Sequence, residues 1–156
     1  MKTKLAVLLL CCAIGSELKA ESTFQRLKAV AIVVEDLSTD AVKLRLTKED
    51  LESTALVALK SKLPKIAVGK AAVSYVYINV TLVCSEYVCA ANADVSLNRP
   101  STVLEDDNQK VGFSLANVWH ANMLFIGPRD TMSHRVKEYI DEALTQFAAE
   151  WYKANP

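Results

Sequence analysis

The chain has 156 residues, of which 51% are hydrophobic and 23% charged, and its formal net charge is zero. This length suffices for one domain with a substantial core and is too short for two domains of ordinary size. The hydrophobic content excludes a disordered chain. The charge balance offers no basic surface of the kind that binds nucleic acid, so we expect no nucleic-acid partner.

The first twenty residues have the pattern of a cleaved export signal. Two lysines precede the apolar stretch LAVLLLCCAI, and a signal peptidase could cut after Ala20 or, alternatively, after Gly15. This stretch is too short to cross a bilayer, which takes about 20 apolar residues. We therefore expect residues 1–20 to be removed and 21–156 to form one periplasmic or secreted domain without a membrane span.

The first part of this domain predicts a strand and then a helix. AVAIVV at 29–34 is typical of a strand that is buried on both faces or central in a sheet, and STDAVKLRL at 38–46 is interpreted as a connection. Thr47 and Asp50 resemble a helix capping box with Asp in place of Glu, and Pro64 ends the helix. Apolar residues recur between these signals at helical spacing, namely Leu51, Ala55, Ala58, Leu59 and Leu63.

Two alternating runs joined by four residues predict a β-hairpin. The apolar face of the first run has Val76, Ile78, Val80, Leu82 and Cys84, and its polar face has Tyr75, Tyr77, Asn79 and Thr81. The second run alternates Cys89, Ala91, Ala93, Val95 and Leu97 with Asn92, Asp94, Ser96 and Asn98. Each strand therefore has one face suited to a core and one suited to solvent.

Cys84 and Cys89 are predicted to form a structural disulfide across this hairpin. Their pairing sets a register in which Leu82 faces Ala91. All the remaining residues on the apolar face of one strand also face apolar residues of the other strand. A slip by one residue would place each apolar side chain opposite a polar one. Cross-strand cysteines also have a separation that a disulfide can bridge, and export places them in an oxidising compartment.

The other interpretations of these cysteines are weaker. A zinc site needs about four ligands, whereas the exported chain offers two cysteines and the distant His120 and His134. Thioredoxin-like chemistry requires Cys-x-x-Cys at the start of a helix, and this pair lies in a hairpin. We therefore expect neither a metal nor a cofactor.

The segment 111–126 is predicted to be either one long bulged strand or two short strands around HAN. A turn is indicated before it by EDDNQK at 105–110, and Pro100 marks a bulge or an edge. Asn117 interrupts the apolar face of the segment. The residues in phase on that face are Val111, Phe113, Leu115, Trp119, Met123 and Phe125.

The chain ends in a predicted amphipathic helix. Gly127 and Pro128 break the preceding strand, and the helix is capped by Asp130, Thr131 or Ser133. Its apolar stripe covers about five turns and contains Met132, Val136, Tyr139, Ile140, Ala143, Leu144, Phe147 and Trp151. The order β-α-β-β-β-α predicts an α+β fold, with an antiparallel or mixed sheet of about four strands and both helices on its apolar face.

Four polar or aromatic residues are candidates for a binding surface. His120 and Asn122 project to the same face as Tyr75 and Tyr77 if their strand joins the sheet. His120 could act as a general base, although a histidine on a half-exposed sheet face is the simpler interpretation. No catalytic constellation is recognisable, so we assign no catalytic residue.

Four motifs, LTKEDLES, YVYINV, DVSLNRP and FAAEWYKANP, together resemble a group of small exported bacterial proteins whose function is not known. The strand and helix order is also similar, at fold level, to small envelope domains such as the lipopolysaccharide-assembly lipoprotein and the amino-terminal domain of the Tol-system propeller protein. These are structural motifs, so the resemblance implies no site residues. It implies an exported α+β domain.

Two functions are compatible with these features. The first is a non-catalytic interaction or assembly-accessory domain of the envelope, which meets a protein partner through the polar sheet face or a sheet edge. The alternative is a small periplasmic hydrolase or ligand carrier with a cleft near His120. The sequence indicates neither the partner nor the oligomeric state.

Overall fold

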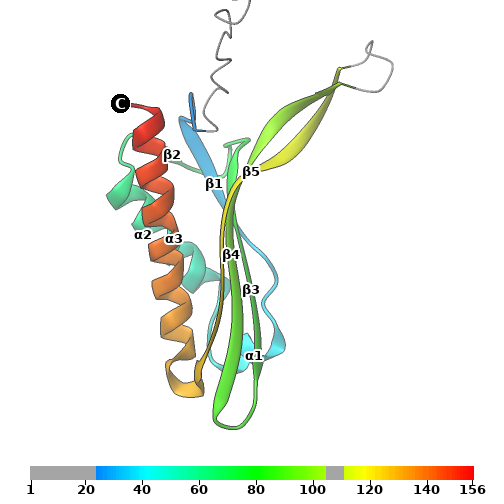
Figure 1. Ribbon diagram of the computed structural model, residues 1–156, viewed down its shortest axis with the longest axis vertical. Coiled ribbons are helices and arrows are strands. Elements are labelled where there is room, and N and C mark those ends of the chain that lie inside the picture. Colours follow the sequence, from blue (N-terminus) through cyan, green and yellow to red (C-terminus); the bar gives the residue numbers. More distant parts are fainter. Residues whose placement is uncertain (1–23, 105–110) are drawn as a thin grey trace, which may run out of the picture.

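The computed structural model describes residues 24–104 and 111–156 and shows an α+β fold with one mixed sheet (Figure 1). The elements are β1 (Ala29–Val34), α1 (Thr39–Lys43), α2 (Lys48–Lys62), β2 (Ala67–Val68), β3 (Tyr75–Cys84), β4 (Val88–Leu104), β5 (Val111–Pro128), a 3-10 turn (Arg129–Thr131) and α3 (Met132–Ala154). The sheet order is β2-β1-β3-β4-β5, and α2 and α3 lie on one face. The export signal and the turn at 105–110 lie outside the described residues.

The predicted fold class is confirmed, with one additional strand. β1 pairs in parallel with β3, whereas β3, β4 and β5 are antiparallel, so the sheet is mixed. A parallel pair requires a crossover connection, and the chain supplies one through α1, α2 and β2. β2 has two residues and forms the fifth strand at the edge beside β1.

The register of the β3–β4 hairpin is the predicted one. Cys84 pairs with Cys89, Leu82 with Ala91, and the ladder continues in step to Tyr75 opposite Asn98. The apolar face packs on α2 and α3, and its most deeply buried members include Ile78 and Leu97. The hydrophobic pattern determines this register because a slip would expose the whole apolar set.

Helix α2 begins and ends as predicted. Thr47 Oγ1 accepts a hydrogen bond from the Asp50 backbone N–H at 3.0 Å, and Asp50 Oδ2 accepts one from the Thr47 N–H at 3.1 Å, so both halves of the capping box are present. The helix ends before Pro64. Asp50 also pairs with Lys137 of α3 at 3.1 Å, and this hydrogen bond is the main cause of its lowered pKa.

The segment 38–46, expected to be a plain connection, contains the short helix α1. Ser38 occupies its N-cap position, where its Oγ donates to the Leu82 carbonyl at 3.0 Å and accepts from the Leu82 N–H at 3.1 Å. A helix of about one turn is unstable by itself in water. Contacts with the distant strand β3 stabilise α1. A local sequence pattern cannot indicate such contacts.

Helix α3 confirms the predicted apolar stripe but not its cap. All of the predicted residues are buried, together with Ala148. The ring of Phe147 packs edge-on against Trp119 of β5 and against Phe24, with centroids 5.2 Å apart in both cases. Thr131 holds the N-cap position, but its hydroxyl donates to the Pro128 carbonyl, and Ser133 donates to the Leu44 carbonyl.

β5 is one long strand with a bulge. The ladder with β4 shifts between Leu97 and Asn98, where Val118 is the additional residue. Because a bulge changes the side-chain phase by one residue, Phe113 and Leu115 are not on the face of Trp119 as expected. Beyond this point β4 and β5 continue without β3 as a two-stranded arm, residues 99–104 and 111–116, that projects from the body (Figure 1).

Candidate functional site

The face of the sheet opposite α2 and α3, here called the outer face, brings the four predicted binding residues onto one surface. Tyr77 on β3 is paired with Ser96 on β4, which is paired with His120 on β5. Asn122 and Tyr75 lie on this same face, in the two neighbouring rows: Asn122 is two residues from His120 along β5, and Tyr75 is two residues from Tyr77 along β3, on the opposite side. Two steps between strands, about 10 Å, separate the tyrosines from the β5 residues.

Side chains of the outer face contact each other along and across the strands. Tyr75 and Tyr77 pack edge to face, with centroids 6.4 Å apart and ring planes at 68°. Asn122 Nδ2 donates to Asn92 Oδ1 at 3.1 Å, which links β5 to β4. His120 is exposed on the strand at the sheet edge. The face is therefore a flat array of aromatic, amide and hydroxyl groups.

The outer face carries almost no formal charge. β3 and β5 contain no Asp, Glu, Lys or Arg, and the charged residues of β4 are Asp94 and Arg99. Asp94 projects to the outer face, whereas Arg99 donates a hydrogen bond to the Gln25 carbonyl. The solvent side of α2 and α3 is rich in charge by contrast. A solvated face normally resembles those helices, so the outer face has the composition of a covered surface.

An exposed apolar patch lies on the same face, near the disulfide. Val83 of β3, Ala90 of β4 and Ile126 of β5 form one row across three strands, and Leu124 lies beside them. Val83, Leu124 and Ile126 are 66%, 70% and 67% exposed. Single exposed apolar residues are ordinary, whereas a contiguous exposed group is the kind of feature that interaction surfaces carry. We call this group, Val83, Ala90, Leu124 and Ile126, the outer apolar patch.

Sequence reasoning missed the outer apolar patch, although a signal was present. Val83 follows Thr81 at the alternation of the polar face, and Leu124 and Ile126 follow Asn122 in the same way. The strands thus carry apolar residues in the polar phase at one end. That pattern becomes informative only when the pairing of β5 with β4 is known.

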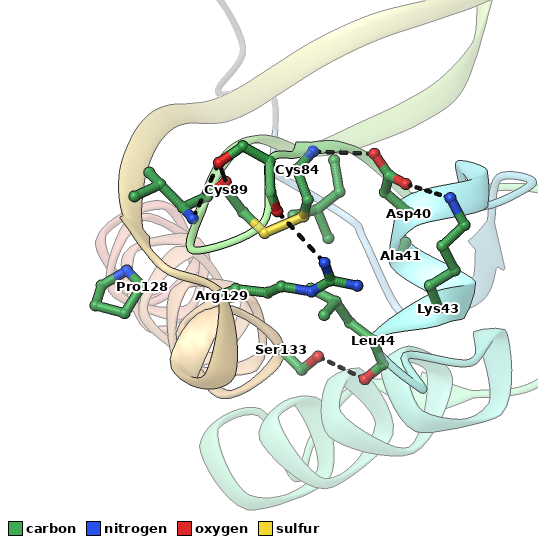
Figure 2. Close-up of a disulfide and its surroundings, with 12 residues drawn as sticks. Asp40, Ala41, Lys43, Leu44, Cys84, Cys89, Pro128, Arg129 and Ser133 are labelled. Carbon is green, nitrogen blue, oxygen red and sulfur yellow. Dashed lines mark hydrogen bonds and ion pairs between the residues drawn. A yellow bond between two sulfur atoms is a disulfide. The ribbon is translucent and has the colours of Figure 1, made fainter.

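The disulfide end of the sheet is held by a network around Cys84 and Cys89 (Figure 2). Asp40 of α1 accepts a hydrogen bond from the Cys84 backbone N–H at 2.9 Å and one from Lys43 Nζ at 3.0 Å. The first of these bonds is the main reason that the pKa of Asp40 is lowered. Arg129 donates to the Ser85 carbonyl at 3.4 Å, which joins the turn after β5 to the hairpin.

An open pocket of about 420 Å³ lies at this end, lined by Leu44, Glu86, Tyr87, Arg129 and Asp130. Tyr87 is 73% exposed, and its carbonyl accepts a hydrogen bond from the Arg129 N–H at 2.9 Å. The pocket contains none of the four predicted binding residues. His120 lies near the middle of β5, on the open sheet face and away from the pocket-lining residues that follow this strand.

Within residues 24–104 and 111–156, no group of three His, Cys, Asp or Glu side chains could hold a metal ion. In that same part of the chain, no helix is both long and apolar enough to cross a membrane.

Comparisons with known proteins assign no family. No family model matches the chain, and none of the curated proteins does so either. Among solved structures, the chain is similar to a dodecamer of a PelC variant from Paraburkholderia phytofirmans, with 12% identity and a TM-score of 0.39 over 80% of this chain and 86% of that one. A likeness of this size is distant, so no residue role is transferred.

Proposed function

We propose that the protein is a non-catalytic interaction domain of the bacterial envelope and that its outer face binds a protein partner. The observation that carries this proposal is the composition of the face. Three strands expose aromatic, amide and aliphatic groups there, with Asp94 as the one formal charge. The cores of protein interfaces are similarly depleted of charge and enriched in aromatic residues.

The arrangement within the face supports a protein rather than a small molecule as the partner. Small-molecule sites are concave and bury most of their ligand. The outer face is an open sheet surface, with the rings of Tyr75 and Tyr77 toward one end and the outer apolar patch at the other. Rigid aromatic rings and exposed aliphatic side chains are the anchors that protein interfaces use.

The disulfide supports an extracytoplasmic location. Thiols of cytosolic proteins are kept reduced, whereas disulfides persist in the periplasm and outside the cell. The Cys84–Cys89 bond joins adjacent strands and closes a short turn, which is a structural position rather than a reactive one. The expected export signal agrees with this location. No specific observation favours the alternative of a hydrolase or carrier near His120, since His120 does not line the described pocket.

Site-specific photo-cross-linking in living cells tests the proposal. A photoreactive residue is placed at Tyr77 or at Val83 of the outer face, and a control is placed at Val57 of α2, which is 68% exposed. We expect the same protein adduct from both outer-face positions and its absence at Val57. Adducts that are identical at all three positions, or missing from the outer face, would contradict the proposal.

A further inference from the structure

β5 forms a long free edge of the sheet. It pairs with β4 on one side, and no strand in the described part of the chain pairs with its other side. After the bulge at Val118, the regular part of this edge runs from Trp119 to Gly127 and extends for about 30 Å. A free edge presents a row of N–H and C=O groups to any other strand.

The protective residues that edge strands usually carry within their own sequence are missing from this stretch. Such strands are guarded by lysines, inward-pointing charges, prolines or bulges. β5 has no charged residue, its proline is the last residue, and its bulge precedes the stretch. Arg135 of α3 covers one acceptor of this edge, since its guanidinium donates to the Ile126 carbonyl at 2.9 Å. The N–H and C=O groups of successive residues point alternately to the two sides of a strand. Those of Asn122 and Leu124 therefore point away from β4, as the carbonyl of Ile126 does.

We propose that β5 pairs antiparallel with β5 of a second copy of this chain, across a two-fold axis near Met123. This inference is independent of the partner proposed for the outer face. Met123 is the midpoint of the regular stretch and is 42% exposed. In this arrangement Leu124 of one copy lies diagonally across the axis from Leu124 of the other. The two outer apolar patches then approach each other at this diagonal.

Charge and topology favour a second copy over a foreign strand. A two-fold pair places each residue opposite residues of the same strand, so any charge near the axis would meet a like charge. The absence of charge from β5 removes this penalty. Head-to-tail growth is disfavoured because the opposite edge, β2, has two residues. The contact therefore closes as a dimer.

The area indicates a weak dimer. A strip about 30 Å long and 10 Å thick buries roughly 600 Å² over both copies, below the roughly 1,200 Å² at which the range of standard interfaces begins. Self-association is therefore concentration-dependent. Dimerisation pairs the free backbone N–H and C=O groups of the β5 edge, without the large apolar interface of an obligate dimer.

Charge complementation at Leu124 tests the proposal. Sedimentation velocity over a concentration series measures the dimer fraction of the wild type, of Leu124→Lys, of Leu124→Glu and of an equimolar mixture of both variants. We expect each variant alone to raise the dimer dissociation constant by roughly tenfold to a hundredfold, and the mixture to regain dimer. Val57→Lys, at a similarly exposed position on α2, should leave the constant unchanged.

The outcomes separate the possibilities clearly. A wild type that is monomeric throughout the series overturns the proposal, as does a dimer that Leu124→Lys leaves intact. Leu124 is 70% exposed, so the substitution should preserve the fold, and circular dichroism checks this. Recovery in the mixture excludes a general loss of folding as the cause.

Discussion

The carboxylate of Asp40 accepts a hydrogen bond of 2.9 Å from the backbone N–H of Cys84. This bond links the short helix α1 to the end of β3, next to the disulfide (Figure 2). We expect Asp40→Asn to lower the melting temperature at neutral pH, because the charged acceptor is lost. Asp36→Asn is the control, since Asp36 is 93% exposed and pairs with Lys48 at the surface.

The same residue predicts a pH dependence. The pKa of Asp40 in the folded protein is lowered from its ordinary value of 3.8, chiefly by the Cys84 N–H and then by Lys43. A lowered folded-state pKa contributes stability above the unfolded value, and this contribution is lost as the pH falls. The difference in melting temperature between the wild type and Asp40→Asn should therefore begin to shrink as the pH falls below about 4 and continue to shrink at lower pH. A difference that stays constant down to low pH would contradict the assignment.

Removal of the disulfide should destabilise the protein modestly. The bond closes a short loop, so its loss through Cys84→Ala with Cys89→Ala is expected to lower the free energy of unfolding by about 2 kcal/mol. Urea unfolding of the wild type with and without reductant measures the same quantity independently. If reduction leaves the unfolding midpoint of the wild type unchanged, the bond has no stabilising role.

Tyr139 has a buried hydroxyl without a hydrogen-bond partner within the described residues, and its burial raises its pKa to about 12. Tyr139→Phe removes the unsatisfied group and is expected to leave stability unchanged or raise it by about 1 kcal/mol. Tyr152→Phe is the matched control, because the Tyr152 hydroxyl donates to the Lys62 carbonyl at 3.1 Å. That substitution should cost about 1 kcal/mol.

The raised pKa of Tyr139 also has a consequence at alkaline pH. The folded protein favours the neutral phenol, so this contribution to stability is complete below pH 10 and declines as the pH rises toward 12. Tyr139→Phe should lose less stability than the wild type over that interval. Equal losses in the two proteins would show that Tyr139 ionises as easily in the folded state as in the unfolded one.

The capping box of α2 offers a direct test of helix stabilisation. Thr47→Ala removes the acceptor of the Asp50 N–H and should lower the free energy of unfolding by about 1 kcal/mol. Thr145→Ala is the control, since Thr145 lies inside α3, where its hydroxyl donates to the Asp141 carbonyl of that helix. Chemical denaturation of both variants compares the two effects. A similar loss of unfolding free energy in both variants would show that the cap has no special role.

Local and periodic features were predictable from the sequence alone. The capping residues of α2, the apolar stripe of α3 and the register of the hairpin from Tyr75 to Asn98 all follow from residue spacing. Each depends on neighbours in the chain or on one alternating pattern. Burial of the apolar side selects a single arrangement in such cases, so the face of Tyr75 and Tyr77 follows from the sequence, whereas that of His120 and Asn122 also required the pairing of β5 with β4.

Features that depend on distant contacts were decided only by the tertiary structure. Helix α1 requires the bonds of Ser38 to Leu82, and the parallel pairing of β1 with β3 requires the whole crossover. The bulge at Val118 moves Phe113 and Leu115 out of the predicted phase. The outer apolar patch exists because three strands meet in one register. Residues far apart in the sequence acquire these properties from their partners, so no local pattern contains them.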